Sequence, residues 1–278
     1  MAETGVHSPY VGMTAEEVVR SYNRSMLTMR VTHIILALAC GAVSIYAVHC
    51  DLEPLYVVGL VLLALDFVVF CIRLGLSFLP LQDILWQDAD VAKYRAVMEA
   101  RALKVRNRRS SANLIELELA FCDYYDGRDR DALTRLDRVS FRGERNFQWV
   151  RAYNLRAMIC NDLGKIADRD AAVARLSQMH ERYRAGSKAE RQLVNLLQSM
   201  EVRFRPVSEW SESDVRFIRE QLVLTEKHLN RAGFQLRLAA WELAQGNTEA
   251  ARRELTASSL EPLAPRQAAE RELLLKQC

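Results

Sequence analysis

Two long apolar runs near the N-terminus dominate the hydrophobic pattern of this chain. They cover Val31 to His49 and Leu55 to Pro80, and only the five residues from Cys50 to Pro54 separate them. Each run is long enough to cross a bilayer as an α-helix, which takes about 20 predominantly apolar residues. The pattern therefore predicts a transmembrane helical hairpin over residues 31–80, with spans at about 31–49 and 55–79.

The first apolar run does not have the form of a cleaved secretory signal. Such a signal has a short basic leader and an apolar run of about 7 to 15 residues, whereas 30 residues precede this run. Thr14 and Glu17 have the spacing of a helix capping box, and Val18, Val19 and Tyr22 continue a helical pattern. We therefore expect residues 1–30 to form a partly helical cytoplasmic segment that leads into the first span.

Basic residues lie on one side of the predicted hairpin. Arg20, Arg24 and Arg30 precede the first run and many more follow the second, but the connection contains Asp51 and Glu53 and no Lys or Arg. Basic residues near a span are retained in the cytoplasm. We expect a two-span protein of a bacterial-type inner or plasma membrane, with both termini cytoplasmic.

Asp66 is a carboxylic acid within the second apolar run. A carboxylate at the centre of a span costs about 3 kcal/mol on insertion scales, so it should not face lipid. Counting inward from the connection places Asp66 opposite the small-residue stretch 37–44, which includes Ser44. We expect an intramembrane polar contact across the hairpin or within a homo-oligomer, rather than a proton or ion relay. Arg73 is expected to reach the inner headgroups, with pairing to Asp66 as the alternative.

The packing of the two spans is predicted from small residues. Ala37 and Gly41 form a small-x-x-x-small pair, which lets two membrane helices approach closely.

Pro80 is expected to end the second span, because it lacks a backbone donor and restricts the preceding residue. Trp86 is expected near the inner membrane boundary, as interfacial aromatic residues commonly are.

Residues 81–110 are predicted to form a juxtamembrane helix with a basic cluster, Lys104, Arg106, Arg108 and Arg109. Such clusters attract anionic lipid by about 1 kcal/mol per basic residue near the surface. RNA binding is the alternative use of these residues. The chain carries a net charge of only +3 and no aromatic residues interleave the cluster, so we do not expect a nucleic-acid partner.

The remaining residues, 111–278, have helical periodicity and almost no alternating β pattern. The fold class is therefore predicted to be all-α. The predicted helices lie at 113–126, 129–139, 146–163, 167–183, 188–204, 212–229, 234–245, 248–257 and 266–277.

Small and apolar residues recur at fixed offsets in these hairpins. Ala120, Gly127, Ala132 and Leu136 have the same spacing as Ala239, Gly246, Ala251 and Leu255; the middle hairpin keeps Ala157 and Gly164 but has Arg169 at the third position. This pattern resembles a divergent tetratricopeptide-repeat domain over about residues 111–258. The family's aromatic residues are mostly replaced, and the third hairpin has an untypical loop.

The resemblance implies a cytoplasmic α-solenoid of about four helical hairpins, with repeat turns at Gly127, Gly164 and Gly246. Stacks of this kind have a concave groove that binds peptide segments or partner helices. The candidate groove residues are Trp149, Tyr153, Arg156 and Trp241. Packing between helices is the alternative interpretation of the aromatic residues.

The motifs of common enzymes are absent from the sequence. There is no P-loop, nucleophile elbow, zinc-protease motif or Gly-rich dinucleotide loop. The six cysteines are scattered, without a C-x-x-C pair or metal-ligand spacing. We therefore expect no enzyme, cofactor or metal.

Together these patterns predict a membrane-anchored scaffold or adaptor that binds protein partners through its helical-repeat domain. It would also contact the lipid bilayer and form a homo-oligomer through the hairpin. The alternative is an accessory subunit of a membrane transport or envelope-building complex that acts through the hairpin.

Overall fold

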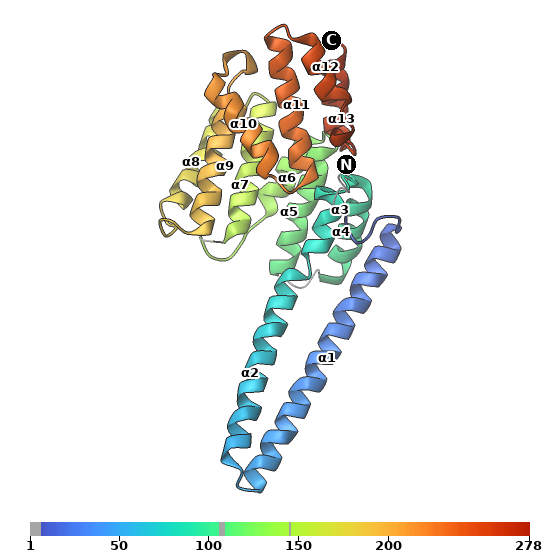
Figure 1. The fold of residues 1–278 in the computed structure, drawn as a ribbon, viewed down its shortest axis with the longest axis vertical. Helices are drawn as coiled ribbons and strands as arrows, with labels where there is room; N and C mark the ends of the chain where they lie inside the picture. The colour runs from blue at the N-terminus through green and yellow to red at the C-terminus, as the bar shows by residue number, and fades with distance from the viewer. Residues whose placement is uncertain (1–6, 106–108, 145) are drawn as a thin grey trace. The chain divides into compact units, whose positions relative to one another are not determined.

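The computed structural model describes residues 7–105, 109–144 and 146–278 (Figure 1). All the regular structure in these residues is helical. The contacts within the chain define two compact units, one that ends at Asp83 and one from Ile84 to Cys278. The predicted all-α class is thus confirmed for the described part of the chain.

The first unit contains α1 (Ala15–His49) and α2 (Glu53–Leu76). The predicted capping box is confirmed at the start of α1, where Thr14 Oγ1 accepts from the backbone N–H of Glu17 and the Glu17 carboxylate accepts from the backbone N–H of Thr14. Both bonds satisfy donors that the first helical turn leaves unpaired. Residues 15–30 and the first apolar run therefore form one continuous helix of 35 residues.

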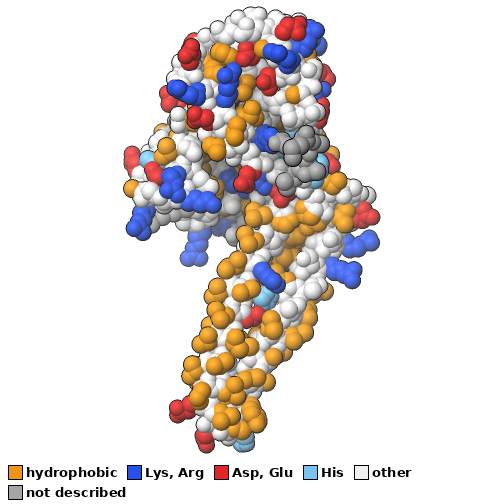
Figure 2. Space-filling view, in the orientation of Figure 1, with side chains coloured by type: hydrophobic (Ala, Val, Ile, Leu, Met, Phe, Trp, Pro, Cys, Tyr) orange, Lys and Arg blue, Asp and Glu red, His pale blue; other side chains and the backbone are white. Residues whose placement is uncertain are grey.

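In the described part of the chain, two helices are long and apolar enough to cross a membrane. The core helix of a soluble protein is mostly buried. In the most apolar stretch of α1 only 17% of the residues are buried, and in the most apolar stretch of residues 53–86 only 6% are. Figure 2 shows hydrophobic side chains covering both helices on the face drawn. Such a large exposed apolar surface is costly in water and stable in lipid.

α1 and α2 approach closely at Gly59, and of the predicted pair Ala37 and Gly41 the glycine takes no part in this approach. A Cβ on Gly59 would clash with Ser44 Oγ and would lie 3.5 Å from the carbonyl oxygen of Cys40, whereas a Cβ on Gly41 would meet nothing within 4 Å. Successive residues of a helix point about 100° apart. Gly41 is therefore turned away from the face of α1 that contacts α2 through Cys40 and Ser44.

The second predicted span also ends differently. α2 ends at Leu76, and Pro80 lies in the first turn of α3 (Leu79–Trp86) rather than ending the span. A proline is tolerated there because the first helical turn does not use its backbone donors. Trp86 does not act as a free interfacial residue, since its ring packs edge-on against Phe121 and Tyr125, with centroid distances of 5.4 Å and 6.0 Å.

The second unit is a succession of helices. Their bounds are α4 Val91–Val105, α5 Arg109–Tyr125, α6 Asp129–Arg138, α7 Phe147–Asp162, α8 Ile166–His180, α9 Lys188–Phe204, α10 Glu212–Leu224, α11 His228–Ala244, α12 Thr248–Thr256 and α13 Pro265–Leu275, with short 3₁₀ turns η1 at Val207–Glu209 and η2 at Ser258–Leu260.

The predicted helices 212–229 and 234–245 are wrong at their shared boundary. α10 ends at Leu224 and α11 already begins at His228. The side chain of Gln87 holds this break: its Nε2 donates to the carbonyl of Glu226 at 3.2 Å, and its Oε1 accepts from the backbone N–H of His228 at 3.1 Å. A residue about 140 positions earlier thus satisfies backbone groups that a continuous helix would have paired internally.

Three helix-to-helix turns share one local geometry. Gly127, Gly164 and Gly246 have φ of +77°, +69° and +78°, a conformation that glycine adopts without steric cost. In each turn the following N–H donates to a carbonyl five residues earlier at 2.8 Å, as in a Schellman motif. Such turns occur in many helical proteins, and the tetratricopeptide-repeat resemblance stays a prediction.

The core of the second unit consists of clusters between successive helices. One lies among α7, α8 and α9, one among α9, α10 and α11, and one among α11, α12 and α13. The small residues Ala120, Ala132, Ala157, Ala239 and Ala251 are fully buried, because helices approach closely only where side chains are small. α13 contacts α5 as well as α11 and α12, so the C-terminal helix packs against an early helix of the unit.

Candidate functional site

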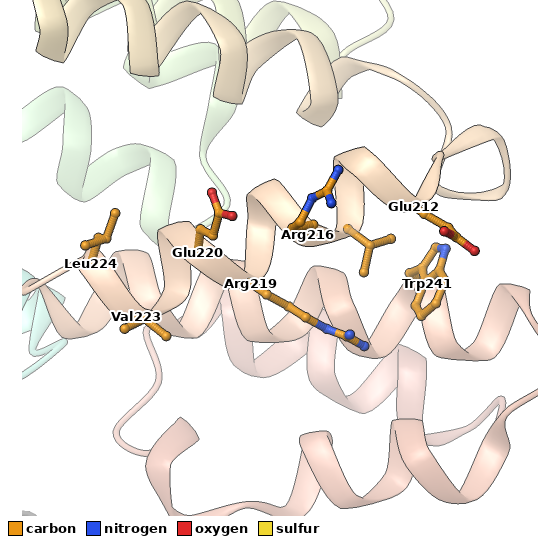
Figure 3. Close-up of a pocket in the computed structure, with 8 residues that line it drawn as sticks. Glu212, Arg216, Arg219, Glu220, Val223, Leu224 and Trp241 are labelled. Atoms are coloured by element: carbon orange, nitrogen blue, oxygen red, sulfur yellow. The ribbon is translucent and has the colours of Figure 1, made fainter.

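A groove runs along the outer face of α10 (Figure 3). Its volume is about 840 Å³ and it is open to solvent along one side. All its lining residues come from α10 except Trp241, which comes from α11. The lining residues of this α10 groove are Glu212, Val215, Arg216, Arg219, Glu220, Val223, Leu224 and Trp241.

Helix α10 is amphipathic, but its outward face is not fully polar. Phe217 and Ile218 are buried in the cluster formed with α9 and α11, as expected for the inner face of such a helix. On the outward side Val223 and Leu224 are 84% and 72% exposed. Single exposed apolar residues are common, whereas these two adjacent ones form an apolar end of the groove, away from Trp241 (Figure 3).

The other end of the groove presents hydrogen-bond donors. Arg219 lies over the ring of Trp241, with 6.0 Å from Cζ to the ring centroid, and its Nη2 is 3.5 Å from Glu242 Oε1. The Arg219 side chain is still 61% exposed. Within the described ranges, the indole N–H of Trp241 has no acceptor and Arg216 has no ion pair. The Trp241 nitrogen is buried, however, so only the exposed guanidinium groups of Arg216 and Arg219 present donors to the groove.

The first turn of α10 is fixed by Ser211 and Asp214, which form a capping box. Burial opposes ionisation of Asp214, but hydrogen bonds from the backbone and hydroxyl of Ser211 and the nearby Arg205 outweigh it and lower its pKa. A carboxyl whose pKa is lowered on folding stabilises the fold above its unfolded pKa of about 3.9, and this contribution is lost as the pH falls through the folded value.

We therefore expect Asp214→Asn to reduce the free energy of unfolding by about 1 kcal/mol at pH 7, the usual size of a cap. The difference from the unaltered chain should shrink towards zero below about pH 4. Urea unfolding at several pH values, monitored by tryptophan fluorescence, measures this difference in the free energy of unfolding. Asp170→Asn, which removes an exposed carboxylate paired with its neighbour Arg169, is the control, and an equal effect of both variants would contradict the prediction.

The four predicted groove residues do not line one groove. Trp149 stacks on Tyr153, with centroids 5.5 Å apart, and contacts Phe141 edge-on; both α7 residues pack against the cluster among α7, α8 and α9. Tyr153 and Arg156 line a separate hollow of about 300 Å³ between α7 and α8, where Arg156 pairs with Asp137. Only Trp241 lines the α10 groove.

Val223 and Leu224 were missed in the sequence. The signal that could have identified them is the helical angle: Val223 lies four residues after Arg219 and seven after Arg216, so it shares their polar face.

A second polar site lies between α1 and α2. His33 Nδ1 and Asp66 Oδ1 are 2.6 Å apart, and the two side chains are only 8% and 14% exposed. The edge of the His33 ring meets Phe70, with centroids 5.1 Å apart. His33 Nε2 is buried and has no hydrogen-bond partner among the described residues.

His33 corrects the predicted surroundings of Asp66. The expected level was near residue 39 of the first span, so the error is six residues, or about 9 Å at ~1.5 Å per residue. The prediction assumed that equal numbers of residues on the two spans reach equal depth. Between the contact of Ser44 with Gly59 and that of His33 with Asp66, however, α1 advances by eleven residues and α2 by only seven. Ser44 instead donates to the carbonyl of Cys40 at 2.9 Å. Arg73 is exposed and forms no ion pair with any residue that the structure describes.

The predicted lipid-binding residues are only partly described. Lys104 is exposed in the last turn of α4, and Arg109 is exposed at the first residue of α5. Arg106 and Arg108 lie outside the described residues. Their contact with anionic lipid stays a prediction.

No family model, curated protein or solved structure matches this chain.

Proposed function

We propose that this chain is a membrane-anchored adaptor that binds a protein partner through the α10 groove. In this proposal α1 and α2 span a plasma or inner membrane, both termini are cytoplasmic, and the helical unit works as a divergent tetratricopeptide-like solenoid. The observation that carries the proposal is the groove itself, which is lined by exposed Val223 and Leu224 at one end of α10 and by Arg219 and Trp241 nearer the other end (Figure 3). Exposed apolar side chains grouped with tryptophan and arginine are typical of protein-binding surfaces.

The membrane part of the proposal rests on two independent features. The apolar stretches of α1 and the following helix are largely exposed, which favours lipid as their surroundings. The connection between them has no Lys or Arg, whereas both flanks are basic, which favours cytoplasmic termini. Lys104 and Arg109 would then add contacts with anionic headgroups.

The test is photo-cross-linking of the full chain in its native membrane, comparing Val223→Asp with Leu103→Asp. These residues are 84% and 82% exposed, so the two substitutions are matched in chemistry and exposure, but only Val223 lines the groove. We expect Val223→Asp to reduce the dominant protein cross-link at least about tenfold, since burying an unpaired charge against a partner costs several kcal/mol. Leu103→Asp should leave it unchanged. Equal yields from both variants would refute the groove as the partner site.

The second candidate function is an accessory subunit of a membrane complex, and the His33–Asp66 pair favours it. Ionisable residues within spans are rare and often functional. Asp66→Asn separates the two functions because it removes the charge and keeps the size. An adaptor should still be cross-linked to its partner through the groove, whereas a subunit that acts through the hairpin should lose its partner or its transport activity.

A further inference from the structure

We infer that α13 is a detachable ligand of its own chain. Its Arg266 fills a guanidinium-binding site on the helical unit, and an arginine-bearing helix of another protein can take its place. This site is distinct from the α10 groove, and the inference does not rest on the proposed function.

Three helix ends form the guanidinium-binding site. Tyr124 lies near the end of α5, Asp129 is the first residue of α6, and Asp162 is the last residue of α7. A carboxylate at the C-terminal end of a helix meets the negative end of the helix dipole. A cation placed beside Asp162 therefore stabilises this carboxylate.

Arg266 is bound in this site through both arms of its guanidinium group. Nη1 donates to Asp129 Oδ1 at 2.6 Å and to the carbonyl oxygen of Tyr124 at 3.1 Å. Nη2 donates to Asp162 Oδ2 at 2.7 Å, and Cζ lies 4.1 Å from the centroid of the Tyr124 ring. Two carboxylates, a carbonyl and an aromatic face suit the planar, forked guanidinium better than the compact ammonium group of lysine.

The site does not depend on α13 for its shape. The Tyr124 hydroxyl donates to Asp162 Oδ2 at 3.3 Å and accepts from Nη2 of Arg203 on α9 at 2.8 Å. With Arg266 in place, the side chains of Asp129 and Asp162 are only 17% and 22% exposed. Departure of α13 would leave these acceptors held by other helices and would uncover two carboxylates that have lost their main cation.

Helix α13 itself is held by few buried groups. Among its residues, all of which the structure describes, only Gln267 is buried, whereas α5 has ten buried residues and α7 has seven. Its apolar contacts lie towards its other end, where Leu274 and Leu275 are partly buried. Elements with few buried apolar contacts open at a low cost in free energy. Leu260, which is fully buried before the helix, would keep the released segment attached.

The probe is a dye-labelled synthetic peptide of residues 261–278, added to the full chain in lipid nanodiscs and monitored by fluorescence anisotropy. In the unaltered chain, the tethered α13 competes with the peptide at a local concentration on the order of 1 mM. We expect Arg266→Ala, which weakens the tethered helix, to bind the peptide at least about tenfold more tightly than the unaltered chain does. Arg271→Ala is the control and should not increase binding, because Arg271 pairs with Glu261 of the same segment and not with the site.

Further variants test the assigned contacts in the Arg266→Ala chain. A peptide that itself carries Arg266→Ala should bind at least about tenfold more weakly than the native peptide, since it lacks the charge-assisted hydrogen bonds. Asp162→Asn should remove most of this preference, whereas Val223→Asp in the α10 groove should leave it unchanged. If Arg266→Ala loses the native tryptophan emission and so fails to fold, Arg266→Lys replaces it, because lysine keeps the charge but lacks the paired donors.

Hydrogen exchange gives a readout that needs no peptide. The backbone amides of α13 should exchange at least about tenfold faster in Arg266→Ala than in the unaltered chain, because the helix then opens more often. Arg271→Ala should have a smaller effect. Unchanged exchange in Arg266→Ala would show that Arg266 does not hold the helix in place, and the inference would fail.

The peptide experiment has three outcomes that overturn the inference. Equal binding by the unaltered chain and Arg266→Ala, or no binding by either, would show that α13 is not a replaceable occupant. Equal binding of the two peptides, or a preference that Asp162→Asn leaves intact, would contradict the assigned contacts. If Val223→Asp weakens the peptide, the peptide binds in the α10 groove; the inference then fails while the proposed function stands.

Discussion

Arg151→Met is expected to reduce the free energy of unfolding of the helical unit by about 3–5 kcal/mol, the usual effect of breaking a buried ion pair. Arg151 on α7 forms two bonds to Glu118 on α5, with Nη1 2.6 Å from Oε1 and Nη2 3.0 Å from Oε2. The Glu118 side chain is fully buried. Without Arg151, a carboxylate would remain in the core with its main counter-charge removed.

The surroundings of Glu118 explain why water cannot replace the arginine. Tyr94 is also fully buried there, and burial together with the charge of Glu118 raises its pKa well above the ordinary value. The Arg151 guanidinium lies 5.0 Å from the centroid of the Phe121 ring. The site is therefore enclosed by aromatic side chains, in a setting of low polarity where an unpaired charge is most costly.

Urea unfolding in detergent measures this effect through tryptophan fluorescence. All four tryptophans, Trp86, Trp149, Trp210 and Trp241, belong to the unit from Ile84 to Cys278, so the signal reports that unit alone. The matched control is Arg182→Met, which breaks an ion pair between side chains that are 48% and 79% exposed and should cost less than about 1 kcal/mol.

A double variant identifies the cause. If the loss arises from the stranded carboxylate, Glu118→Gln combined with Arg151→Met should unfold at a higher urea concentration than Arg151→Met alone, because the buried charge is then absent. An additive loss in the double variant, or an equal loss in Arg182→Met, would contradict the explanation.

His33→Leu is expected to destabilise the α1–α2 hairpin by about 3 kcal/mol, because it leaves the Asp66 carboxyl group unpaired within the apolar segment. Among the described residues, the 2.6 Å contact between His33 Nδ1 and Asp66 Oδ1 is the one ion-pair or hydrogen-bond contact of Asp66. His33→Leu with Asp66→Leu should recover most of the loss, since both polar groups are then removed together.

The measurement is reversible unfolding by SDS in mixed micelles. Energy transfer between dyes at the exposed positions Leu27 of α1 and Leu76 of α2 reports separation of the two helices, in a background without the native cysteines. His49→Leu, at the exposed end of α1, is the control and should be near neutral. Recovery by the double variant supports pairing, whereas greater destabilisation would show that each side chain has another essential contact.

Much of the helical pattern could be predicted from the sequence because its signals are local. The capping box of Thr14 and Glu17, the apolar runs, and the turns at Gly127, Gly164 and Gly246 depend on residues within about one helical turn of one another. Such short-range preferences act whatever the rest of the chain does. They determined the helical class and most of the helix boundaries.

Only the tertiary structure decided which distant residues meet. Gln87 sets the break between α10 and α11 through bonds to Glu226 and His228. His33 pairs with Asp66 from a level six residues away from the one expected. Neither partner is marked by a local pattern, because each contact depends on how helices slide and rotate against one another during packing.

The candidate site divides in the same way. Trp241 could be identified from its residue type, but its grouping with Arg219 and Val223 depended on where α10 ends and which face it buries. Because α10 ends at Leu224, Val223 and Leu224 are exposed at one end of the groove. The sequence by itself determined the helices and their apolar content, whereas long-range packing decided which apolar residues are buried and which remain exposed in the groove, since burial depends on neighbours that are distant in the chain.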